Sequence, residues 1–106
     1  MAAFQQIMDV LPGSLRALDF SDVQELRLRV GQAPSVLENG RERQLSGLVR
    51  PGELDGILQR ATSYSAHAFQ DALRQGYVTL PGGHRIGVCG SAVVKTVSWL
   101  AIRRSA

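Results

Sequence analysis

Hydrophobic and polar positions alternate with a period of two in the stretch VQELRLRV, residues 23–30. Leu26, Leu28 and Val30 fall on one side of an extended chain, and Glu25, Arg27 and Arg29 fall on the other. This is the pattern of a half-buried β-strand. Further along, Asn39-Gly40 is a strong hairpin signal, because a type I′ turn needs a positive φ at both central positions. We therefore expect strands within residues 23–45.

The period changes to that of an amphipathic α-helix in three places. The first is a helical start over residues 3–18, whose apolar positions include Phe4, Ile7, Met8 and Leu11. The other two are helices within residues 51–75, with apolar positions at Leu54, Ile57, Leu58 and Ala61, and then at Ala66, Phe69, Ala72 and Leu73. Pro51 suits the first helical position, Ser65 an N-cap, and Gly76 a helix end.

Residues 76–103 return to strand-like patterns around the glycine-rich stretch YVTLPGGHRIGVCG. Pro81 and Gly82 fit the central positions of a type II turn between two strands. Gly87 and Gly90 fit bulges or places where another backbone comes close. The order of helix, strands, two helices and strands predicts one α+β domain over residues 1–106. We expect a mostly antiparallel sheet with the helices packed on one face.

Composition narrows the class of protein without identifying it. The chain has 106 residues, 44% of them hydrophobic and 20% charged, which is typical of a globular domain. No apolar run approaches the ~20 residues that span a bilayer, and no secretory signal is evident, so we expect a cytoplasmic protein. The net charge of +3 is uneven. Residues 84–106 contain four basic residues and no acid, which favours an anionic partner or a solvated basic edge.

The glycine-rich stretch does not meet the requirements of a nucleotide-binding loop. A P-loop needs the pattern GxxxxGK[ST] between a strand and a helix. The nearest stretch ends in Lys95-Thr96 and has Cys89 and Val94 where the two glycines are required. A turn between strands fits these residues better than a phosphate-binding loop.

The chain offers no pattern for catalysis or metal binding. Cys89 is its only cysteine, and no cluster of cysteine and histidine has metal-ligand spacing. We expect His67 and His84 to be polar surface residues. We therefore predict no catalytic residue, no metal site and no cofactor bound by this chain.

The arginines indicate a candidate binding site more clearly than the histidines and the cysteine do. Arg27 and Arg29 share a strand face, Arg85 begins a strand, and Arg103 ends one. Each is singly consistent with a solvated surface. Arginines on rigid strands are also good donors to a phosphate presented by another domain, because the direction of each guanidinium is restricted.

Three stretches, LPGSLR (11–16), VQELRLRVGQAP (23–34) and GYVTLPGGHRIGVCG (76–90), resemble the N-terminal region of the stage III sporulation protein AA family. The similarity extends over nearly the whole chain. The residues that carry the motifs are Glu25, Arg27, Arg29, Gly76, Tyr77, Pro81, Gly82, Gly83, His84, Arg85, Gly87 and Gly90.

The resemblance implies a PAS-like N-terminal domain of a secretion-type ATPase. In that family an ATPase domain with a P-loop follows, and it is absent from this chain, so ATP and Mg²⁺ are expected only with that domain. Arg85 and Arg103 are then the candidates for contact with its nucleotide. The implied partners are the chain's own ATPase domain, neighbouring subunits of a homo-hexamer, and membrane-associated proteins of a sporulation channel. The implied place is the cytoplasm of the mother cell, at that channel.

A small nucleic-acid-binding module that uses its basic strand faces is the alternative. It would need exposed aromatic rings on which bases stack. The chain has only six aromatic residues, and we expect Tyr77 and Trp99 to lie in core-forming strands. On that reasoning the sequence disfavours nucleic acid and favours the motor module.

Overall fold

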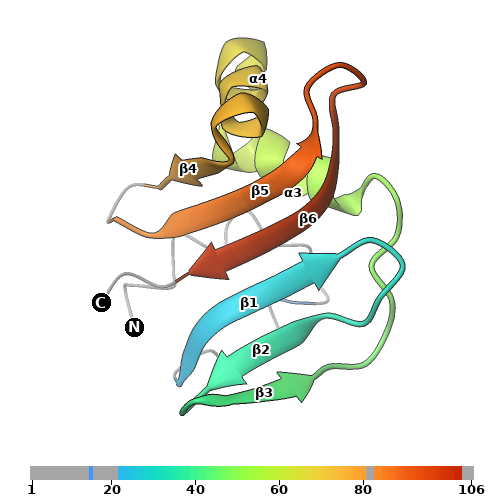
Figure 1. Ribbon diagram of the computed structural model, residues 1–106, viewed down its shortest axis with the longest axis vertical. Coiled ribbons are helices and arrows are strands. Elements are labelled where there is room, and N and C mark those ends of the chain that lie inside the picture. The colour runs from blue at the N-terminus through green and yellow to red at the C-terminus, as the bar shows by residue number, and fades with distance from the viewer. Residues whose placement is uncertain (1–14, 16–21, 81–82, 104–106) are drawn as a thin grey trace.

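The computed structural model describes Leu15, residues 22–80 and residues 83–103 (Figure 1). The elements are β1 (Val23–Arg29), β2 (Ser35–Glu38), β3 (Arg41–Gln44), α3 (Glu53–Ala61), α4 (Ala66–Gln75), β4 (Tyr77–Thr79), β5 (Arg85–Ser91) and β6 (Thr96–Arg103). Leu15 is helical, while the rest of the predicted helix over residues 3–18 lies outside the described residues.

The strands form one six-stranded sheet in the order β3-β2-β1-β6-β5-β4. Each named strand pairs antiparallel with its neighbours, and one isolated parallel bridge joins Val30 to Val49. Two three-stranded meanders therefore meet at the centre, where the first and the last strand lie side by side (Figure 1). The predicted α+β class with a mostly antiparallel sheet is confirmed.

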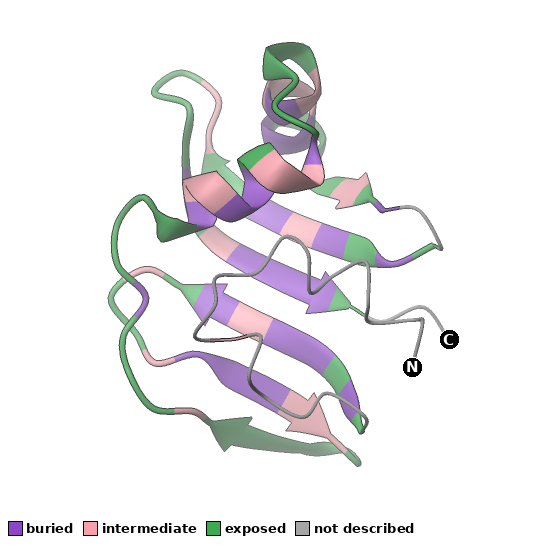
Figure 2. Cartoon of the chain, turned by 180° about the vertical axis from the view of Figure 1, so that it is seen from behind, coloured by how far each residue is buried: buried purple, intermediate pink, exposed green. Residues whose placement is uncertain are grey.

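The two described helices cover one face of the sheet, over its β4–β6 half (Figure 2). Each helix buries three apolar residues, which are Leu54, Ile57 and Leu58 of α3 and Phe69, Ala72 and Leu73 of α4. The opposing strand residues Ile86, Leu100 and Ile102 are fully buried. Hydrophobic burial of this kind holds the helices against the sheet. Ala66, expected inside, is exposed.

Local helix signals are largely confirmed. The Ser65 hydroxyl accepts a hydrogen bond from the Ala68 N–H at 3.1 Å, so Ser65 is the N-cap of α4. Gly76 ends α4 with a φ of 88° and donates its N–H to the Ala72 carbonyl. The start of α3 differs from the prediction, because Gly52 takes the N-cap place with a φ of 91° and Pro51 precedes it.

The predicted turn at Asn39-Gly40 is also confirmed. The two φ angles are 49° and 75°, as a type I′ turn requires, and β2 pairs with β3 around it. This hairpin places β3, whose four residues are all exposed, at the edge of the sheet.

The glycine-rich stretch forms the hairpin between β4 and β5. The Leu80 carbonyl accepts from the Gly83 N–H at 3.0 Å, and the Leu80 N–H donates to the His84 carbonyl at 2.7 Å. Pro81 and Gly82, expected at the centre of a type II turn, lie outside the described residues. Gly83 has a φ of 87°, a conformation that favours glycine.

Gly90 lies at an irregularity in the pairing of β5 with β6, between Cys89 and Gly90. A Cβ added at Gly90 would come within 2.2 Å of the Thr96 carbonyl oxygen. Both expected features, a bulge and a close backbone approach, are therefore confirmed there. They are absent at Gly87, whose added Cβ would meet only ordinary contacts of 3.6 Å or more. In addition, β5 ends at Ser91.

Candidate functional site

The sheet face opposite α3 and α4 is here called the open face (Figure 1). By strand register it contains the charged residues that alternate along β1, β5 and β6. The antiparallel register fixes which side chains share it. From β1 to β4 its residues are Glu25, Arg27 and Arg29, then Trp99, Ala101 and Arg103, then Arg85, Gly87 and Cys89, then Tyr77 and Thr79. No described helix lies over this face (Figures 1 and 2).

The two arginines singled out from the sequence lie directly opposite each other. Arg85 of β5 pairs with Arg103 of β6, and Arg103 pairs with Glu25 of β1. Like charges directly opposite each other in a sheet repel. The arrangement therefore depends on how each guanidinium is compensated.

Arg103 is compensated by Glu25. The Glu25 Oε1 atom accepts from Arg103 Nη2 at 2.8 Å and from Arg103 Nε at 3.1 Å. Its Oε2 atom accepts from Nε of Arg27 on the same strand. The two arginine side chains are 70% and 38% exposed, whereas Glu25 as a residue is only 5% exposed. Arg27 and Arg103 thus cover the carboxylate from the solvent side.

The Glu25 carboxylate keeps its charge in this position. Burial raises the pKa of Glu25, but hydrogen bonds from Arg27 and Arg103, together with the positive charges of both, more than offset that effect. The pKa is therefore lowered from its ordinary value. At neutral pH both arginines face a full negative charge, and each is held by it.

The same network reaches the β3 edge of the sheet. Nη1 of Arg27 lies 3.5 Å from the Glu42 Oε2 atom, and the Ser35 hydroxyl donates to that oxygen at 2.9 Å. Glu42 and Glu25 thus both have partners on the open face. Glu25, Arg27, Glu42, Arg103 and Ser35 therefore form one connected set of ion pairs and hydrogen bonds.

Arg85 is differently placed. Its guanidinium lies over the ring of Tyr77 on β4, with the carbon at its centre 4.5 Å from the ring centroid, a cation–π contact. Neither Arg85 nor Arg29 has a carboxylate partner within the described part of the chain. These two arginines are the cations of the open face that remain available to an anion.

Tyr77 and Trp99 lie in strands of the sheet, as expected, but their side chains are not part of the core. Tyr77 is 42% exposed, and Trp99 is half-buried on the open face. The period-two pattern predicts that Trp99 and Arg103 share one face of the sheet, because they have the same parity. The buried Leu100 and Ile102 have the opposite parity. Strand parity therefore places Trp99 on the open face.

The two histidines differ in their exposure. His67 of α4 has an exposed side chain 3.9 Å from Asp71, as expected for a surface residue. His84 is 2% exposed, so its prediction as a surface residue is wrong. It lies at the start of β5, and its carbonyl accepts from the Leu80 N–H at 2.7 Å.

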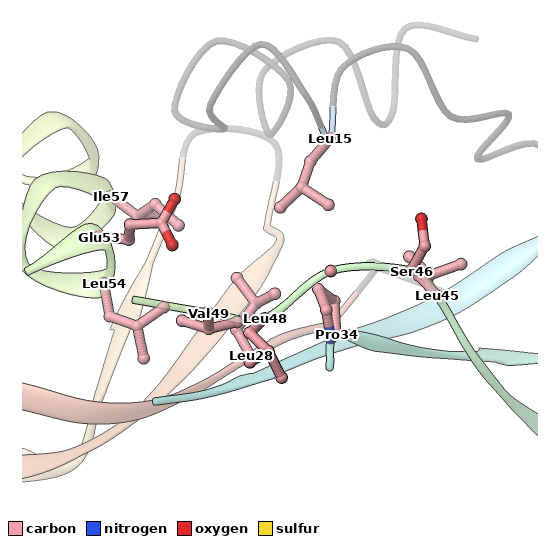
Figure 3. Close-up of a pocket in the computed structure, with 11 residues that line it drawn as sticks. Leu15, Leu28, Pro34, Leu45, Ser46, Leu48, Val49, Glu53, Leu54 and Ile57 are labelled. Carbon is pink, nitrogen blue, oxygen red and sulfur yellow. The ribbon is translucent and has the colours of Figure 1, made fainter. Parts of the chain in front are cut away.

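A pocket with a mainly apolar lining lies on the other side of the sheet (Figure 3). It has a volume of about 320 Å³ and lies between α3 and the segment that leads to it. Its lining is mainly aliphatic, with Leu28, Leu45 and Ile57 among its residues. Its one carboxylate, Glu53, accepts from the Arg50 N–H at 2.6 Å. The pocket suits an aliphatic group, and its lining offers no set of polar groups for catalysis.

The other motif residues shape the backbone. Gly76, Gly83 and Gly90 lie at a helix end, a turn and a bulge. In the described residues no group of three or more histidine, cysteine, aspartate or glutamate side chains could hold a metal ion. Neither α3 nor α4, the helices that the structure describes at length, could cross a membrane.

Comparison with known proteins places the motifs in context. The family model described as "Sporulation stage III, protein AA" matches residues 2–103. A curated protein of Bacillus subtilis (strain 168), "Stage III sporulation protein AA", is 30% identical over 97 residues. The match covers 85% of this chain and 32% of that protein, so the chain spans about a third of the length of this relative.

Proposed function

The chain belongs to the sporulation stage III protein AA family, and from this premise we propose that it is the non-catalytic N-terminal module of a secretion-type ATPase. The module is PAS-like and forms a single domain. An ATPase domain with a P-loop follows it and binds ATP and Mg²⁺. The module contributes to assembly of a ring of identical subunits and supplies arginines to the nucleotide site.

One observation carries this proposal, which is the pairing of Arg85 with Arg103 on adjacent strands. The sheet places the two residues side by side on the open face, with the guanidinium of Arg103 on Glu25 and that of Arg85 over Tyr77. A phosphate group presented by another domain would find the donors of Arg85 beside the positive charge of Arg103, and charge-assisted hydrogen bonds to phosphate are the strong ones.

The two arginines have different roles in this proposal. Glu25 holds Arg103, so Arg103 keeps the strand end in place and contributes positive potential. Among the described residues Arg85 has no carboxylate partner to release, and the ring of Tyr77 supports its guanidinium. Arg85 is therefore the arginine that contacts the γ-phosphate, where charge develops during phosphoryl transfer.

The remaining partners follow from the family. The proposed site of action is the cytoplasm of the mother cell, where the motor meets membrane-associated proteins of a sporulation channel. Neighbouring subunits contact the module on the helix-covered side of the sheet.

ATP turnover by this chain alone tests the non-catalytic role. We expect a rate no higher than that of the same chain with Arg85→Gln, because the chain has no P-loop to hold the phosphates and Mg²⁺. Phosphate release is measured for both proteins from the same purification. Turnover by the unmodified chain that disappears in the variant would contradict the proposal.

A further inference from the structure

The open face carries two aromatic rings close to one another. A Cβ at Gly87 would lie 3.6 Å from the Cζ3 atom of Trp99, so the indole comes over β5 where a side chain is missing. Tyr77 of β4 lies directly opposite Gly87 on the other side. Two ring surfaces therefore flank one glycine, on three adjacent strands.

Beside each of these rings lies an arginine that has no carboxylate partner among the described residues. Arg85 lies over Tyr77, and Arg29 of β1 is directly opposite Trp99 of β6. Within the described part of the chain neither arginine has a carboxylate partner, because Glu25 and Glu42 are engaged by Arg27, Arg103 and Ser35. From the strand geometry the Cα atoms of Arg29 and Arg85 are about 16 Å apart across the sheet.

The surface around Trp99 is hollowed. One hollow of about 130 Å³ is lined by Arg27, Arg29, Gln32 and Trp99 among others. A second, shallower one of about 450 Å³ is lined by Arg29, Cys89, Ser98 and Trp99 among others. Arg29 and Trp99 line both hollows, so a planar group beside the indole would also meet a guanidinium.

We propose that the open face binds single-stranded nucleic acid, with bases stacked on Trp99 and Tyr77 and phosphates paired with Arg29 and Arg85. Bases supply planar rings and the backbone supplies regularly spaced negative charge, and the face presents partners for both. No described helix lies on the open face to enter the groove of a duplex, which favours the single strand. Because stacking and phosphate pairing tolerate any base, the binding is independent of sequence.

This activity goes beyond the proposed role in the motor and does not depend on it. The motor role requires that Arg85 meets a phosphate held by another domain. The nucleic-acid role requires only this chain, and it requires the two rings and Arg29 as well. The two can therefore be tested separately.

Trp99 is the only tryptophan of the chain, so its fluorescence reports directly from the proposed site. The experiment titrates the chain with an oligodeoxythymidine of about 12 nucleotides and measures the quenching of Trp99 and the anisotropy of a labelled strand. We expect quenching that saturates. Neutralisation of two phosphates should make binding about sevenfold weaker when salt rises from about 50 mM to about 200 mM.

Three variants on the open face and one control locate the binding. Arg29→Gln and Arg85→Gln each remove one phosphate partner, and Tyr77→Ala removes one ring. We expect Tyr77→Ala to weaken binding by at least about fivefold. Arg74→Gln removes the same charge from α4, where Arg74 pairs with Asp71, and should leave the affinity unchanged. Tyr77, Arg29 and Arg85 are exposed, so all variants are expected to fold, and their circular dichroism checks this.

Three results would each overturn the proposal. The first is no saturable quenching and no anisotropy change at the lower salt concentration. The second is a loss of affinity in Arg74→Gln equal to that in Arg29→Gln and Arg85→Gln, which would indicate non-specific attraction to net charge. The third is equal affinity for free ATP and for the oligonucleotide, which would assign the site to a mononucleotide.

Discussion

Arg85→Gln, introduced into a protein in which this chain continues into its ATPase domain, is expected to lower kcat for ATP hydrolysis by at least about 100-fold. An arginine that reaches the γ-phosphate stabilises charge that develops in the transition state, and glutamine removes that charge. KM for ATP should change much less, because the contact strengthens mainly in the transition state.

The geometry of the open face explains why Arg85 has the larger effect. Its guanidinium lies over Tyr77 and has no carboxylate partner in the described part of the chain, so it reaches a phosphate without breaking an ion pair. Arg103 would first have to leave Glu25, with which it makes two hydrogen bonds. We therefore expect a smaller loss of kcat for Arg103→Gln.

Steady-state phosphate release checks this expectation, with Arg74→Gln as the control of equal charge on α4. The control should retain the kcat of the unmodified protein. If Arg85→Gln keeps kcat within a factor of about two of the control, Arg85 makes no contact of the kind that an arginine finger makes.

Gly90→Ala is expected to lower the free energy of unfolding of the chain by about 2–3 kcal/mol, at the upper end of the range for overpacking. The new methyl group would lie 2.2 Å from the Thr96 carbonyl oxygen and 3.0 Å from both the Val97 Cα and the Leu73 Cδ2 atoms. Two of these three neighbours belong to the backbone of β6, which cannot turn aside as a side chain can.

Gly87→Ala on the same strand is the matched control. Its added methyl group would have ordinary contacts of 3.6–3.9 Å with Trp99 and Ala101, so we expect a loss below about 1 kcal/mol. Urea denaturation of both variants, followed by circular dichroism, gives the two values. Equal stability of the two variants would mean that the close approach at Gly90 does not limit the packing of β5 against β6.

Local signals in the sequence predicted the described elements well because each depends on a few neighbouring residues. The turn at Asn39-Gly40, the cap at Ser65 and the helix end at Gly76 all formed where expected. The α+β class followed from the order of these elements. The family resemblance, carried mainly by the glycine-rich motif, was confirmed by the match over residues 2–103.

The candidate site was less predictable because it depends on pairing between distant strands. Arg103 and Glu25 are 78 residues apart, and only the register of β1 with β6 brings them together. The alternating pattern likewise did not show that Glu25 would be only 5% exposed. The atoms that cover its carboxylate belong to Arg27 and Arg103. In contrast, strand parity alone would have placed Trp99 beside the arginines.

If this chain is the N-terminal module of a longer motor, the coding DNA beyond the codon of Ala106 encodes an ATPase domain. We expect an in-frame strand–GxxxxGK[ST]–helix pattern within the next several dozen codons of the source genome. A stop codon directly after Ala106 in the source genome would contradict it, since no ATPase domain would then be joined to the open face.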